Sequence, residues 1–215
     1  MPLSLFSLAL RMHPGDIMIT AAVYKELKDK YGAVASWALW SPAGTTKKSN
    51  TADLSIFDDP NLLVKLNPKY VFVALNAANH PNPQSLPAWS CFHSSYRYQN
   101  DYKLRTATQG TRFEGAYITD IIKYYVETDS TKVKAAIRKD TTIVMNNLMY
   151  FQEELDLLKS ANNGTAPILI ALGNDVYDLL SKYLTGYTIE NVKHYAGYFS
   201  DAWYQQHFDE KLVNI

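Results

Sequence analysis

The chain has 215 residues, 47% of them hydrophobic, so a single domain can bury a core without disulfides or a structural metal. Its 21 basic and 21 acidic side chains give a formal charge of zero, which argues against a protein that coats nucleic acid by phosphate neutralisation alone. Because Cys91 is the single cysteine, neither an intramolecular disulfide nor a multi-thiolate metal site can form, and we expect a reducing, cytoplasmic location.

The N-terminal third predicts short elements separated by polar loops. The opening run MPLSLFSLALRM lacks a basic start and a clean cleavage site, so it is interpreted as structural. No stretch reaches the roughly 20 apolar residues that span a bilayer, so no membrane association is expected. Residues 17–31 predict a helix that ends at Gly32. The next segments predict a short strand, an exposed loop and a short helix, at 36–42, at 43–52 and from Pro60.

The rest of the chain alternates apolar strands with helices. Four segments have the β-branched and aromatic character of buried strands, the last more weakly: 69–76, 115–122, 166–172 and 188–195. Helices are predicted at 145–161 and 174–184, and the basic run 131–140 is interpreted as a solvated helix face rather than a phosphate contact. This alternation predicts one α/β domain over residues 1–215, a three-layer α/β/α sandwich with a short, mostly parallel central sheet.

Polar side chains stand where these strands end, the edge at which such sheets bind ligands. Asn76 follows the first strand and could orient a water or simply cap a turn. Asp120 in the second could act as a general base or form a turn. His194 follows the fourth strand, where a histidine favours a functional interpretation. The third strand ends at Gly173, for which we predict a tight turn with Asn174 or Asp175 capping the next helix.

Other chemistry finds little support in the sequence. It contains no glycine-rich phosphate loop, no HExxH or comparable metal-ligand spacing and no GxSxG elbow, so neither a cofactor nor a metal is expected. Cys91 has His93 nearby but no orienting partner, and it is interpreted as a packed apolar group.

Between roughly residues 69 and 205, the order of these strand ends resembles the uracil-DNA glycosylase superfamily. ALNAA (74–78) takes the place of the family motif GxNPG or GxDPY, whose third residue positions the attacking water, so Asn76 matches that residue. GAYITDIIK (115–123) is similar to the family strand xYITNxxK, with Asp120 in place of the amide that reads the base edge. ILIALGNDVYDLL matches the third strand. VKHYAGYF supplies His194 and, as the loop that enters the minor groove, Tyr195, Ala196, Gly197 and Tyr198.

The resemblance implies a DNA glycosylase-like hydrolase that acts without a cofactor on a base flipped out of single- or double-stranded DNA. Phe92 or Trp89 would stack on that base and His194 would stabilise the leaving base. A carboxylate cannot donate to uracil O4. We therefore expect Asp120 either to select a base with an exocyclic amine or protonated ring, or to be protonated itself.

Two other functions stay open. The first motif lacks the family's leading Gly and its Pro-Gly turn, which would suit a noncatalytic nucleobase- or DNA-binding protein. An unrelated small-molecule hydrolase could use His194 and Asp120. The stretch HSSYRYQNDYKLR (93–105) interleaves aromatic and basic residues, and predicts either stacking and phosphate contact through Arg97, Lys103 and Arg105 or an ordinary tyrosine-rich surface helix.

Overall fold

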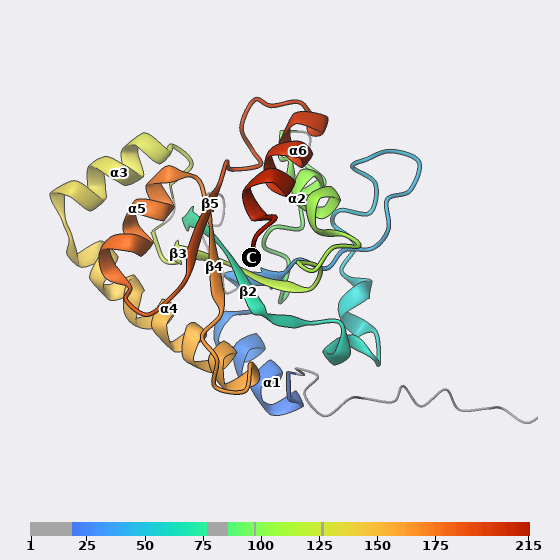
Figure 1. Ribbon diagram of the computed structural model, residues 1–215, viewed down its shortest axis with the longest axis horizontal. Coiled ribbons are helices and arrows are strands. Elements are labelled where there is room, and N and C mark those ends of the chain that lie inside the picture. The colour runs from blue at the N-terminus through green and yellow to red at the C-terminus, as the bar shows by residue number, and fades with distance from the viewer. Residues whose placement is uncertain (1–18, 77–85, 97, 126) are drawn as a thin grey trace, which may run out of the picture.

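The computed structural model describes residues 19–76, 86–96, 98–125 and 127–215 (Figure 1). The opening apolar run, the end of the ALNAA motif and Arg97 therefore lie outside the described residues. Within them are five strands, β1 (Ala35–Trp37), β2 (Asn67–Asn76), β3 (Ala116–Ile122), β4 (Ile168–Leu172) and β5 (Ile189–Val192). The helices are α1 (Ala21–Tyr31), α2 (Asp101–Thr108), α3 (Ser130–Lys139), α4 (Thr142–Ala161), α5 (Asn174–Tyr183) and α6 (Asp201–Leu212).

The strands form one mostly parallel sheet, as predicted. Their order is β1-β3-β2-β4-β5, with β2, β3, β4 and β5 parallel and β1 antiparallel on the edge beside β3. β2 lies at the centre, and its run Val71–Ala74 is buried because both faces of a central strand are covered. All the parallel strands therefore end at the same edge of the sheet.

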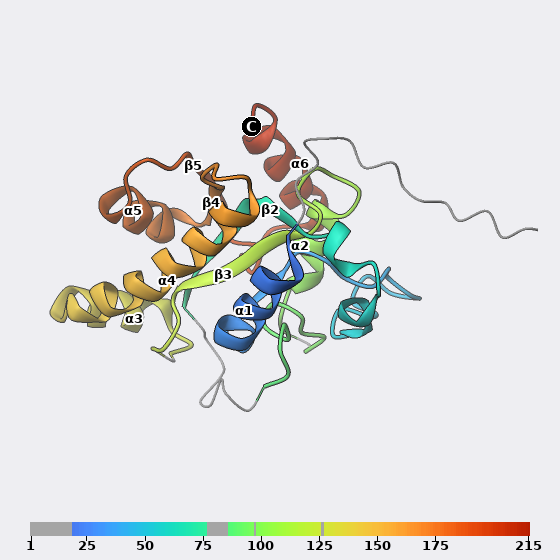
Figure 2. The same ribbon diagram turned by 90° about the horizontal axis from the view of Figure 1, so that it is seen from below.

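Side chains alternate between two hydrophobic cores, one on each face. Along β2, Val71 and Val73 enter the core with α1, α4 and α5, whereas Phe72 and Ala74 enter the core with α2 and α6. Figure 1 shows α4 and α5 on one side of the strands and α2 and α6 on the other, and Figure 2 shows α1 on the side of α4. The predicted three-layer α/β/α sandwich is thus confirmed.

Several local predictions are confirmed and others are wrong. The helix before Gly32 is present: Thr20 caps its first turn and the Gly32 N–H bonds to the Lys28 carbonyl. Instead of a helix starting at Pro60, two short 3-10 turns flank it, at Ser55–Asp58 and Leu62–Val64. Neither Asn174 nor Asp175 caps α5: the N-cap is Gly173 itself, at φ 106°, and makes no side-chain hydrogen bond.

Gly115, the first residue of the motif GAYITDIIK, lies where a side chain cannot fit. Its φ is 75°, and a Cβ would lie 1.9 Å from the backbone carbonyl oxygen of Lys65. The chain needs this close approach because the Gly115 carbonyl accepts from Asn67 N–H and its own N–H donates to Ala38, both at 2.8 Å. Glycine at this position therefore fixes how β3 enters the sheet beside β2.

Candidate functional site

A pocket of about 780 Å³ opens at the carboxyl edge of the sheet. Asn76 from the end of β2, Asp120 from β3, and His194 from the loop after β5 all line it. The other walls come from residues within 90–96 and 98–100, the start of α2 and the starts of α3 and α5. The structure thus brings together three residues that lie 44 to 118 positions apart in the sequence, at the edge where parallel sheets bind ligands.

Asp120 presents an unpartnered carboxyl group to this pocket. It pairs in register with Ala74 and is 4% exposed on the α2 and α6 face of the sheet. Among the described residues, none donates a hydrogen bond to its carboxyl oxygens, and burial raises its pKa to about 7, against the pull of nearby Lys123. Near neutral pH this group can therefore exist as an acid or as a carboxylate, as a proton-transfer residue must.

His194 is held as a neutral imidazole with a defined tautomer. The Ala196 N–H donates to Nδ1 at 3.1 Å, so the ring proton resides on Nε2. Burial lowers the pKa of His194 to about 4. The ring also stacks on Tyr195, with centroids 4.6 Å apart. His194 can therefore offer an Nε2–H donor to a bound molecule at neutral pH.

The side-chain amide of Asn76 is also fixed in orientation. Its Nδ2 donates to the carbonyl oxygens of Tyr125 and Glu127, at 3.3 and 2.8 Å. These two bonds use the amide hydrogens and leave Oδ1 as the polar atom available to the pocket. Asn76 can accept a hydrogen bond, as orientation of a water requires, but does not offer a donor.

Of the two aromatic candidates for base stacking, only Phe92 lines the pocket. Its φ is 64°, a left-handed backbone that costs a bulky residue about 1–2 kcal/mol, so the surrounding bonds must hold it there. Trp89 instead lies in the opposite core at 1% exposure, where its Nε1 donates to the Tyr24 hydroxyl at 2.8 Å. Trp89 therefore packs in the core on the other face of the sheet and does not line the pocket.

The loop after β5 contributes unevenly. Tyr195 and Ala196 line the pocket, Gly197 lies away from it, and Tyr198 is fully exposed to solvent. The Tyr195 hydroxyl faces Asp101, the first residue of α2. The predicted loop is thus a pocket wall in its first half and an exposed aromatic tip at Tyr198.

Asp101 is a pocket residue that the sequence analysis missed. It is 6% exposed, accepts a hydrogen bond from Ser94 N–H at 2.8 Å, and burial raises its pKa to about 6. An aspartate in the first turn of a helix is common on electrostatic grounds alone, so its position in the sequence gives no functional signal.

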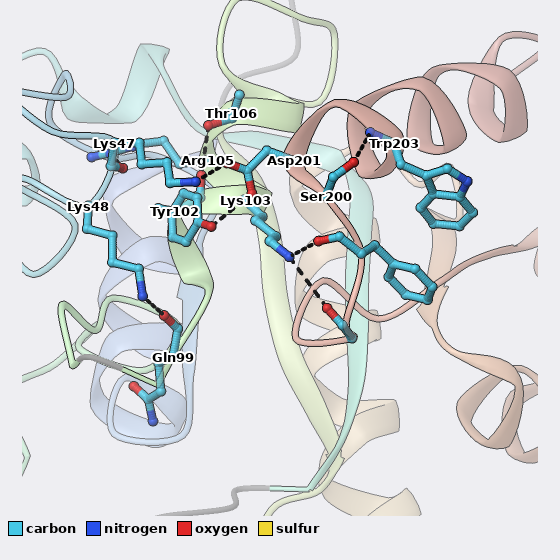
Figure 3. Close-up of polar contacts among 12 residues, drawn as sticks. Lys47, Lys48, Gln99, Tyr102, Lys103, Arg105, Thr106, Ser200, Asp201 and Trp203 are labelled. Carbon is cyan, nitrogen blue, oxygen red and sulfur yellow. Dashed lines mark hydrogen bonds and ion pairs between the residues drawn. The ribbon is translucent and has the colours of Figure 1, made fainter.

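Two basic residues of the stretch 93–105 are described, Lys103 and Arg105, and both hold loops in place through hydrogen bonds to backbone carbonyls. Lys103 is 6% exposed and donates to the carbonyls of Gly197 and Phe199, at 3.4 and 2.7 Å, as the dashed lines in Figure 3 show. Arg105 is 2% exposed and donates to the carbonyls of Ser41, Lys47 and Ser49. Both predicted alternatives are therefore wrong for these two residues, because neither is on the surface.

A buried ion pair lies behind the site. Lys123 and Glu154 are both fully buried and paired, and Lys123 also donates to the Thr119 hydroxyl at 2.6 Å and the Asp120 carbonyl at 2.7 Å. Glu154 accepts from the hydroxyls of Tyr117 and Thr119. The lysine of the GAYITDIIK motif therefore fixes the backbone of Asp120.

The pocket wall is rich in acceptors and carries acidic charge. Its described lining includes the carboxyl groups of Asp101, Asp120 and Asp175 and no lysine or arginine. Asp175 is exposed and forms an ion pair at 3.2 Å with Lys134, a residue that is not part of the pocket lining.

The cysteine of the pocket is not a nucleophile at neutral pH. Cys91 donates to the Ala33 carbonyl, and burial raises the pKa of its thiol to about 12.

In the part of the chain that the structure describes, no group of three or more histidine, cysteine or acidic residues could hold a metal ion. None of the helices there is both long and apolar enough to cross a bilayer. Comparisons of the chain with protein-family models, with curated proteins and with solved structures find no match.

Proposed function

We propose that the chain is a DNA glycosylase-like hydrolase, which breaks the N-glycosidic bond of a base flipped out of DNA. One observation carries the proposal: Asn76, Asp120 and His194 line a single pocket, with Phe92 on its wall. A volume of about 780 Å³ exceeds what one base needs, and leaves room for the attached sugar and a water.

Each residue has a chemical role that agrees with its environment. The flipped base stacks on Phe92, and Asp120 contacts its polar edge. As the bond breaks, its electron pair moves onto the base, and the Nε2–H of neutral His194 donates a hydrogen bond to the base. The water that adds to the sugar carbon releases its proton to solvent. A preorganised donor of this kind lowers the reaction barrier by about 3–4 kcal/mol. The Asn76 Oδ1 accepts from a water and orients it toward the sugar carbon.

The test is cleavage of oligonucleotides that carry uracil, hypoxanthine, xanthine or a mismatched thymine, single- and double-stranded, with alkali to reveal abasic sites. Cleavage of at least one is expected, with a loss of about 100-fold or more in His194→Ala from removal of the donor. Asn76→Ala should also lose activity, whereas Asn146→Ala, an exposed asparagine on α4, should not. Cleavage that both site variants retain would contradict the proposed roles.

A second function, noncatalytic nucleobase binding, has one observation in its favour. The described pocket lining has no lysine or arginine to neutralise DNA phosphates. This second function would be identified if calorimetry shows binding of free bases while no oligonucleotide is cleaved and no free nucleoside is hydrolysed. Hydrolysis of free nucleosides without cleavage of DNA would instead indicate a small-molecule hydrolase.

A further inference from the structure

Several hydrogen-bond acceptors converge on the pocket, beside hydroxyl and amide side chains that can either donate or accept. Carboxyl oxygens come from Asp120 and Asp101, and Asn76 contributes its Oδ1 because its Nδ2 is bonded to backbone carbonyls. The Nε2–H of His194 is one side-chain donor of the pocket, and the hydroxyls of Ser90 and Ser94 in its lining can also donate. Acceptors need donors on the ligand, so the wall matches a molecule rich in N–H groups.

The charge of the pocket leads to the same class of ligand. Two of its carboxyl groups, those of Asp120 and Asp101, are at least nine-tenths buried. Lys123 acts on Asp120 and Lys48 on Asp101 from outside the described lining, and Asp101 also accepts from Ser94 N–H, whereas no described residue donates to the Asp120 carboxyl oxygens. A buried carboxylate without a partner is unfavourable, and a cation that enters the pocket supplies the missing partner. The rings of Phe92, Tyr96 and Tyr195, which also line the pocket, add faces that attract a flat cation.

We propose that the pocket selects a planar nitrogen heterocycle with two adjacent N–H donors and a positive charge, an amidinium-like edge, over the neutral lactam edge of uracil. Ring-protonated cytosine and adenine present such an edge, and so does cationic 7-methylguanine, which keeps its N1–H and its 2-amino group. Asp120 receives the two N–H groups and Phe92 stacks on the ring. This specificity rests on the proposed function, since it names the base that the glycosylase would excise.

The preference depends on pH, because the carboxylate form must be present. Burial raises the pKa of Asp120 to about 7 and of Asp101 to about 6, so cation affinity should rise between pH 5.5 and 8. The titratable and charged groups around Asp120 come from every neighbouring element: Cys91, Asp101, Lys123, Glu154, Asp175, His194 and Tyr195. Of these, His194 stays neutral over this range, since its pKa is lowered to about 4.

Calorimetry with benzamidine and benzamide tests the preference directly. These two flat molecules have nearly the same shape, and benzamidine is a cation throughout this pH range whereas benzamide is neutral. At pH 8, benzamidine should bind at least about tenfold more tightly, the usual gain from hydrogen bonds to a charged group. Its affinity should fall at least about threefold at pH 5.5. Equal affinities, no binding of either, or an affinity for benzamidine independent of pH would overturn the proposal.

Variants locate the effect. Asp120→Asn should abolish the preference for benzamidine, and Asp178→Asn, an exposed aspartate on α5, should keep it. Circular dichroism checks that both variants fold. If Asp120→Asn does not fold, the pH dependence of benzamidine affinity in the unaltered protein decides the test. A preference that survives in folded Asp120→Asn would contradict the role of this residue.

The same measurements separate this specificity from the glycosylase activity. Among oligonucleotides, the protein should cleave one with cationic 7-methylguanine faster than one with uracil, each rate being corrected for base loss without protein. Faster cleavage of uracil, with benzamide bound as well as benzamidine, would refute the specificity and leave the glycosylase function standing. Selective binding of benzamidine with no cleavage of any oligonucleotide would refute the glycosylase function alone.

Discussion

Replacing Asp120 by asparagine should stabilise the protein at alkaline pH, although it damages the site. The pKa of this carboxyl rises from its ordinary 3.8 to about 7 on folding, because burial disfavours its charged form. The difference is about 3 pH units, and each unit corresponds to about 1.4 kcal/mol. Its contribution to folding is fully present below pH 3.8 and is lost as the pH rises through 7. At pH 8 the carboxylate should thus cost the fold on the order of 4 kcal/mol, an upper bound that relaxation of the pocket reduces.

Urea unfolding at pH 4.5, 6 and 8 measures this cost. The free energy of unfolding of Asp120→Asn relative to the unaltered protein should increase steadily from pH 4.5 to pH 8. Asp101 titrates in both proteins, so its effect cancels in the difference. The exposed control Asp178→Asn should show no such trend. A stability difference for Asp120→Asn that is constant with pH, or that falls toward pH 8, would refute the reasoning.

Three further predictions concern the fold around the site, and urea unfolding checks each of them. Glu154→Gln should lose about 3–5 kcal/mol because it leaves the Lys123 ammonium buried without its counter-ion, and adding Lys123→Met should recover part of that loss. A double variant as unstable as the sum of both single variants would contradict this. Gly115→Ala should cost more than about 3 kcal/mol, whereas Gly110→Ala, where φ is also positive but the space is open, should cost about 1–2 kcal/mol; equal losses would rule out the steric reason. Lys103→Met should cost about 1–3 kcal/mol, since two loop carbonyls lose their donor, and no loss would show that water replaces it.

The sequence predicts the parallel strands well because they are continuous apolar runs bounded by polar loops. β2, β3, β4 and β5 all lie within or next to their predicted ranges. The antiparallel pairing of β1 depends on contacts with residues of β3 that lie 80 to 84 positions away, which local patterning does not encode. The helix α6 was not predicted: only Tyr204, Phe208 and Leu212 are buried along it, and most of its other residues are polar.

The candidate site divides along the same line. Asn76, Asp120 and His194 could be identified because each stands at or just beyond the end of a recognisable strand. Phe92 and Trp89 could not be separated, since residues only three positions apart lie on different sides of one strained turn. Lys103 was misjudged because a basic residue among tyrosines is usually exposed, and its burial depends on carbonyls contributed by the far end of the chain.

The long-range hydrogen bonds of Lys103 and Arg105 in α2 determine how late during synthesis the pocket can form. Lys103 bonds to carbonyls 94 and 96 residues later in the chain, and Arg105 to carbonyls 56 to 64 residues earlier. Contacts of such long range form late in folding, because each requires a large loop to close first. A nascent chain that has emerged only as far as β4 can pair three parallel strands but lacks His194 and the carbonyls that hold Lys103. The pocket is thus completed only after residues 194–199 have left the ribosome, so a nascent chain that stops short of them lacks a wall of the pocket.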